Sequence, residues 1–97
     1  MLLQAAARLQ AIKDSWHENK SDLDDALHYN RKLWAVLLTS VTGDSNQLPI
    51  DIRQNVANLG VYVIKQTMAI MTDPQPHALN SLILINRELA SGLLGRA

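Results

Sequence analysis

The residues whose side chains could most clearly form a binding site are two Asn-Arg pairs that occur in nearly the same sequence context. The first pair lies in residues 27–33 (LHYNRKL) and the second in residues 83–89 (ILINREL), and each is followed by two adjacent leucines. Spacings of three and four residues put Asn30, Asn86 and Trp34 on helix faces that otherwise carry leucine and isoleucine. An amide is therefore predicted at two positions where a hydrocarbon side chain is expected.

A buried Asn lowers stability unless its amide finds partners, so each is expected to bond to a backbone group or to the other Asn. In a functional interpretation, Asn30, Arg31, Asn86 and Arg87 form a binding site. In a structural interpretation, the asparagines, together with Trp34, fix the register of two helices, and the arginine stems cover the edge of the core. The structural interpretation is favoured because register specification is the best attested use of such an Asn.

The segment over residues 49–72 is predicted to be a helix with two apolar stripes. The first stripe consists of Ile52, Val56, Leu59, Val63 and Ile70, and the second of Ala57, Val61, Ile64, Met68 and Met71. Together they cover more than half of the helix circumference, so this helix is either central in its own bundle or half covered by a partner. Methionine suits a docking groove and also fills core gaps. The second stripe is the candidate partner-binding surface, with the core as its alternative.

The apolar periodicity and the breaks between periodic segments predict an all-α fold in one domain over residues 1–97. We expect a small bundle of about four helices, mostly antiparallel neighbours because the connections are short. The expected helices cover roughly residues 2–18, 22–42, 49–72 and 76–94.

Several residues indicate where these helices begin and end. Ser21 with Asp24 resembles a capping box at the start of the second helix. Gly43 suits the left-handed position after its end. Pro49 suits the first turn of the third helix, and Pro74 is expected to push Asp73 out of helical geometry.

Composition excludes several function classes. The chain has nine basic and nine acidic residues, which balance to a formal net charge of zero, and it has no Phe and no Cys. Nothing in this balance drives binding to nucleic acid or to an anionic membrane. The absence of cysteine removes disulfides and fits a reducing cytoplasm. The longest apolar runs are far shorter than a membrane span, so a cytoplasmic protein without membrane contact is expected.

Catalytic and metal-binding patterns are also missing from the sequence. The histidines, His17, His28 and His77, stand apart and lack a second ligand at metal-binding spacing. No nucleophile is paired with a base, and no glycine-rich loop could cradle a phosphate. The sequence predicts a protein that is not an enzyme and needs no cofactor or metal.

Four motifs resemble the FlaF family of flagellar biosynthesis regulators from alphaproteobacteria. They are Asn30-Arg31-Lys32-Leu33-Trp34, Leu48-Pro49, Asn58-Leu59-Gly60 and the run from Ile85 to Leu93. The resemblance implies a cytoplasmic protein needed for flagellin synthesis or secretion that contacts flagellin and acts opposite or together with the FlbT repressor. Members of the family usually carry a further segment before the helix that starts here at Leu2, so the start resembles a trimmed one.

Three functional hypotheses follow. The first, which we favour, is a regulator or chaperone of flagellin that binds an amphipathic helix of flagellin or of a FlbT-type protein in an apolar groove. The second is a post-transcriptional regulator that contacts flagellin mRNA through Arg31, Lys32, Arg87 and Arg96, which the balanced charge disfavours. The third is a structural bundle that associates with itself.

Overall fold

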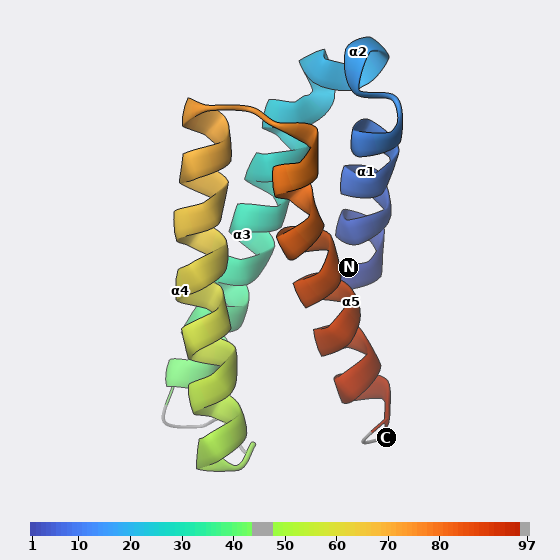
Figure 1. The fold of residues 1–97 in the computed structure, drawn as a ribbon. Helices are drawn as coiled ribbons and strands as arrows, with labels where there is room; N and C mark the ends of the chain where they lie inside the picture. Colours follow the sequence, from blue (N-terminus) through green and yellow to red (C-terminus); the bar gives the residue numbers. More distant parts are fainter. Residues whose placement is uncertain (44–47, 96–97) are drawn as a thin grey trace.

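A computed structural model describes residues 1–43 and 48–95 of the chain, and within these ranges it contains helices and turns but no strand. Four long helices, α1 (Leu2–Asp14), α3 (Leu23–Thr42), α4 (Ile50–Thr72) and α5 (Leu79–Gly95), make up most of the fold (Figure 1). A short helix α2 (Trp16–Asn19) and a 3-10 turn (Lys20–Asp22) join α1 to α3, and a second 3-10 turn (Pro76–Ala78) precedes α5. The prediction of a small all-α bundle is confirmed.

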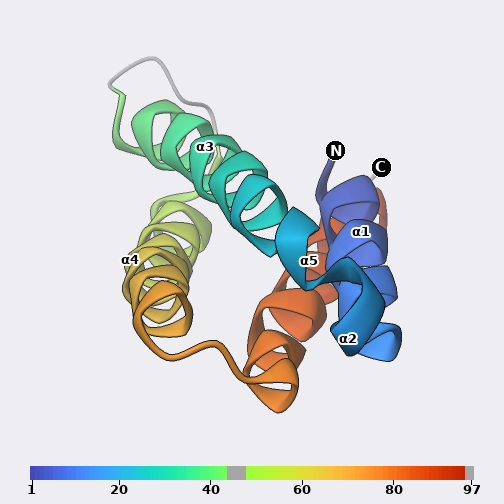
Figure 2. The same ribbon diagram turned by 90° about the horizontal axis from the view of Figure 1, so that it is seen from above.

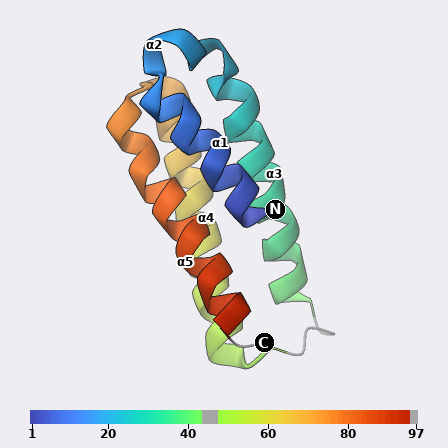
Figure 3. The same ribbon diagram turned by 90° about the vertical axis from the view of Figure 1, so that its right-hand side faces the viewer.

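The four long helices alternate in direction, so consecutive helices are antiparallel (Figures 1 and 3). α1 packs against α5 and also against α3, while α3 packs along α4. In contrast, α4 and α5 share few contacts and diverge away from the segment that joins them (Figures 1 and 2). The contact between α4 and α5 is therefore the least extensive of those between neighbouring long helices.

The core lies where α1, α3 and α5 converge and continues between α3 and α4. Trp34 is its largest side chain and is completely buried. Its other fully buried large apolar side chains are Leu9, Leu27, Val63, Ile70, Leu79 and Leu82. Each of the four helices places an apolar face inward at spacings of three and four, and burial of these faces is the main stabilising contribution.

The first helix is shorter than the predicted range of residues 2–18. α1 ends at Asp14, and Ser15, with φ −121° and ψ 50°, separates it from α2. The change of direction at Ser15 lets the half-buried Trp16 pack against the core. Periodicity alone could not reveal this break, because the apolar spacing continues through it.

Two predicted helix-end features are wrong. Ser21 is exposed in the 3-10 turn, and no side-chain bond caps α3, whose preceding residue Asp22 has the right-handed angles φ −88° and ψ −6°. A capping box would need Ser21 to stand in extended conformation directly before the helix, but Ser21 lies inside the 3-10 turn and α3 begins only at Leu23. Gly43 has φ −76° and ψ 146°, an extended rather than left-handed conformation. Asp73, at φ −139° and ψ 83°, does leave helical geometry before Pro74, as predicted.

Candidate functional site

The two repeated asparagines meet in the core. The indole Nε1 of Trp34 donates a hydrogen bond to Oδ1 of Asn86 over 2.8 Å. The Nδ2 of Asn86 donates to Oδ1 of Asn30 over 2.6 Å and to the backbone carbonyl of Leu2 over 3.4 Å. Trp34, Asn30 and Asn86 are all fully buried. This polar cluster therefore joins α3, α5 and the start of α1, and the expected bond between the two asparagines is confirmed.

The chemistry of the indole sets the orientation of both amides. Because the Trp34 N–H can only donate, Asn86 must turn its oxygen toward the indole and its nitrogen toward Asn30. Asn30 must then accept with its own oxygen, and its Nδ2 is left buried without a partner among the described residues. An unsatisfied buried donor costs about 1–3 kcal/mol. The cluster is a directional chain of bonds with one open donor at its end.

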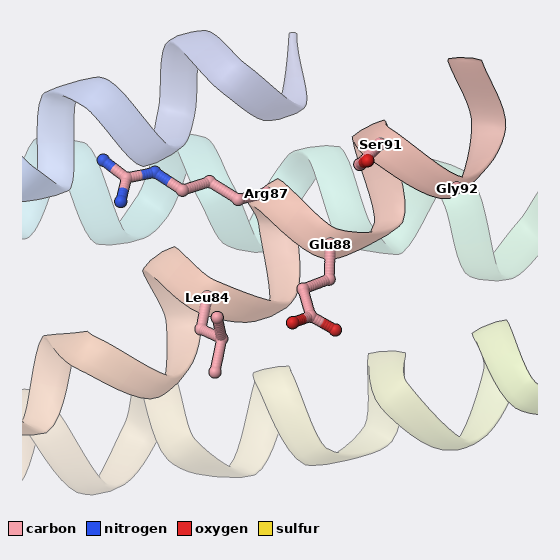
Figure 4. Close-up of a pocket in the computed structure, with 5 residues that line it drawn as sticks. All are labelled: Leu84, Arg87, Glu88, Ser91 and Gly92. Carbon is pink, nitrogen blue, oxygen red and sulfur yellow. The ribbon is translucent and has the colours of Figure 1, made fainter. Parts of the chain in front are cut away.

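The two asparagines and two arginines of the functional interpretation do not share one surface. Arg31 is half-buried on α3, where its Nη2 lies 3.4 Å from Nδ1 of His28 on an exposed part of that helix. Arg87 is exposed on α5 and points toward α1 (Figure 4). The asparagines are closed to solvent while the arginines lie outside the core, so no ligand could contact all four. The register role of the asparagines remains a prediction.

The two stripes of α4 have different environments. In the first stripe Val56, Val63 and Ile70 are buried in the core. In the second stripe Val61 is 49% exposed and Met68 is 61% exposed, while the other three members are half-buried. The second stripe thus lies at the outer border of the α3–α4 contact.

The exposed stripe is longer than the sequence-based prediction. Ile50 is 68% exposed at the start of α4 and lies seven residues before Ala57, with the exposed Gln54 between them. The result is a row of seven residues at alternating spacings of four and three, which we call the outer seam of α4. It consists of Ile50, Gln54, Ala57, Val61, Ile64, Met68 and Met71. The heptad spacing could have identified Ile50 beforehand.

Close packing of α3 on α4 determines how the outer seam is flanked. Gly60 faces Leu38, and a Cβ placed on Gly60 would lie only 2.6 Å from Leu38 Cδ2. Toward the start of α4 the two helices leave a hollow of about 290 Å³. It is lined by Val41, Thr42, Ile50, Arg53, Gln54 and Ala57. The seam therefore borders a surface depression that another side chain could enter.

A second apolar hollow lies between α4 and α5 and was not predicted. It has a volume of about 300 Å³ and is lined by Leu59, Leu84, Ile85, Glu88 and Leu89. On the outer side of α5 it adjoins a shallow depression beside Ser91 and Gly92, where Glu88 points toward α4 (Figure 4). This hollow depends on the divergence of α4 and α5, which no local sequence pattern encodes.

Two further properties of the described residues concern metal binding and membrane insertion. Among residues 1–43 and 48–95, no group of three or more His, Cys, Asp or Glu side chains is arranged to hold a metal ion. No helix in the same part of the chain has the length and apolar character needed to cross a bilayer.

Comparison with known proteins gives one finding. A family model described as flagellar protein FlaF matches residues 1–93, which is almost the whole chain. Neither the curated protein sequences nor the solved structures contain a match. The match covers the polar cluster, the outer seam and the hollow between α4 and α5, and it shows that the chain belongs to the FlaF family of flagellar proteins.

Proposed function

We propose that this chain is a non-enzymatic regulator or chaperone of flagellin synthesis and secretion, acting in the cytoplasm. Its direct partner is an amphipathic helix of flagellin, and a FlbT-type regulator is a second partner for the same surface. The family membership supports the flagellar process. The observation that carries the binding mode is the outer seam, which exposes the apolar side chains of Ile50, Val61 and Met68 at the start, middle and far part of α4.

The seam fits an amphipathic helix better than a small molecule or a nucleic acid. Its seven residues follow the spacing at which helices pack side by side, and the two depressions beside α4 are shallow and open. Burial of apolar surface supplies the affinity, since the chain carries no net charge. Binding should therefore depend only weakly on salt, unlike a nucleic-acid complex.

The test compares two neighbouring residues of α4. Val61 is 49% exposed and belongs to the outer seam, whereas Tyr62 is 45% exposed and points about 100° further round the helix. Flagellin is titrated into the parent chain, into Val61→Asp with Met68→Asp, and into Tyr62→Asp, which controls for a new carboxylate on the exposed surface of α4. We expect the double variant to lose at least about tenfold in affinity, because a buried carboxylate without a partner opposes binding. The control should bind like the parent.

Circular dichroism of the same variants separates binding from folding. The helical signal should survive in Val61→Asp with Met68→Asp, because both side chains already face solvent. Loss of that signal would mean that the seam belongs to the core. Equal affinity of all variants for flagellin would refute the outer seam as the binding surface. Leu84→Asp would then test the hollow between α4 and α5 as the binding surface.

A further inference from the structure

We propose that the outer seam pairs with the outer seam of a second copy of this chain, in antiparallel orientation, so that the free protein shields its own binding surface. This inference rests on the proposed function for the role of the seam. The pair is a weak dimer that flagellin must open before it can bind.

The spacing of the seam is the first argument. The seven residues of the seam follow one another at alternating spacings of four and three over 22 positions of α4, from Ile50 to Met71. The contact line of a two-stranded coiled coil has the same spacing. The three most exposed apolar side chains of this row are Ile50, Val61 and Met68. A row of this kind is complementary to itself, because the side chains of one helix enter the gaps of an identical one.

In an antiparallel arrangement, the side-chain sizes along one seam are complementary to those of the other, and a long side chain faces a surface hollow. When Val61 of one copy faces Ala57 of the other, a small residue lies opposite a larger one on both sides of the two-fold axis. The same register brings Met68 opposite Ile50, beside the hollow of about 290 Å³ between α3 and α4. Methionine is flexible and adapts to irregular gaps, so its side chain can fill this hollow.

Charge complementarity is the second argument, and it sets the orientation. Asp51 and Lys65 are exposed and each follows a seam residue by one position, so both lie on the flank of the seam that faces away from α3. In the antiparallel register Asp51 of one copy meets Lys65 of the other, and the two-fold axis repeats this pair. Asn58, midway between them, meets its own copy, so no like charges oppose each other among these three described positions.

A parallel pair lacks this match. It would bring the flank with Asp51 and Lys65 against the opposite flank of the second helix, where Gly60 faces Leu38 of α3 and Thr67 is buried. In the antiparallel pair the two α3 helices lie on the same side of the seam. Near that side, α3 carries the exposed small residues Ala35 and Thr39, which line a shallow hollow of about 410 Å³ and leave room for the second α3.

Only three apolar side chains of the row are strongly exposed, so the pair buries little apolar surface and should be weak, with a dissociation constant on the order of 10–100 µM. A weak pair suits a surface that has to be released to a partner. Because both occupants use Val61 and Met68, flagellin and the second copy exclude each other.

The test is sedimentation of the full chain over a wide concentration range, with charge variants that read out the register. The parent should shift from monomer to dimer. Asp51→Lys or Lys65→Asp alone places like charges opposite each other twice and should weaken the dimer roughly tenfold. Both changes together exchange the signs and should restore dimerisation to within about threefold of the parent. Met68→Asp should abolish it, and Tyr62→Asp should leave it unchanged.

Each outcome decides between the two proposals. A chain that stays monomeric at every concentration, or a dimer that Met68→Asp leaves intact, overturns the pairing. Failure of the double charge exchange to restore the dimer overturns the antiparallel register. Addition of flagellin should convert the dimer into a one-to-one complex. A dimer that depends on the outer seam but does not bind flagellin supports the pairing and refutes the proposed function. A monomer that still binds flagellin overturns the pairing and supports the proposed function.

Discussion

The buried polar cluster allows a prediction that compares two asparagines of equal size and equal burial. Asn30 and Asn86 are both fully buried, yet among the described residues the side chain of Asn86 makes three hydrogen bonds and that of Asn30 makes one. The proposed perturbation is alanine at each position in turn. If the bonds decide the cost, Asn86→Ala should be the more harmful change. If only volume decides it, the two variants should be equal.

The magnitudes follow from the groups that lose their partners. Asn86→Ala leaves the Trp34 N–H and the Asn30 oxygen buried without a bond, and two such groups cost about 2–6 kcal/mol. Asn30→Ala removes a donor that already lacks a partner. The Nδ2 of Asn86 then keeps only the Leu2 carbonyl, at 3.4 Å, as its acceptor. We therefore expect Asn30→Ala to lower the free energy of unfolding by about 1–3 kcal/mol through the lost hydrogen bond. Both variants also open a cavity of similar size.

Equilibrium urea unfolding, followed by circular dichroism at 222 nm, measures both changes. A domain of this length has a stability of about 5–15 kcal/mol, so Asn86→Ala should lower the unfolding midpoint strongly or unfold the chain at 37 °C. Thermal melting should show a further drop of roughly 10 °C relative to Asn30→Ala. Equal losses, or a larger loss for Asn30→Ala, would refute the directional bonding scheme.

Three further predictions concern single positions. Gly60→Ala should destabilise the chain by about 1 kcal/mol, because its Cβ would clash with Leu38 Cδ2 at 2.6 Å. In a Leu38→Ala background this clash is removed, and the same change should stabilise the chain because Ala has the higher helix propensity. Gly92→Ala should raise stability by about 0.5–1 kcal/mol because no atom lies within 4 Å of its added Cβ. Urea titrations of Gly60→Ala, Leu38→Ala, their combination and Gly92→Ala test both statements. A lower stability of Gly92→Ala, or a higher stability of Gly60→Ala in the parent chain, would contradict them. Asn30→Asp introduces a buried carboxyl whose pKa is raised by desolvation above about 3.9. The folded chain then keeps a proton that the unfolded chain releases, so the stability of Asn30→Asp relative to the parent should fall as pH rises from about 4 through the folded pKa. A pH-independent difference would show that the carboxyl finds solvent.

Much of the helical framework could be predicted from the sequence, because the apolar spacing of each helix is local information. α4 begins at Ile50 and ends at Thr72, within one residue of the expected range. The burial of Asn30 and Asn86 could also be predicted, since each sits on an apolar face. That Trp34 orients their amides could not, because the partners lie 52 and 56 positions apart in the chain.

The surfaces beside α4 depend on how whole helices cross and were only partly predictable. Val61 and Met68 were assigned to a possible docking face by spacing, and their exposure agrees with that interpretation without testing it. The break at Ser15 and the hollow lined by Leu59 and Leu84 had no signal in the sequence. Both follow from tertiary packing, which turns α2 over the core and lets α5 diverge from α4.

The most direct test of the outer seam as the partner-binding surface is a chemical-shift titration of the isotopically labelled chain with unlabelled flagellin. The largest changes should fall on Ile50, Val61 and Met68 and on the residues of α3 that border them. Changes confined to Leu84 and Glu88, or no changes at a saturating concentration of flagellin, would contradict it.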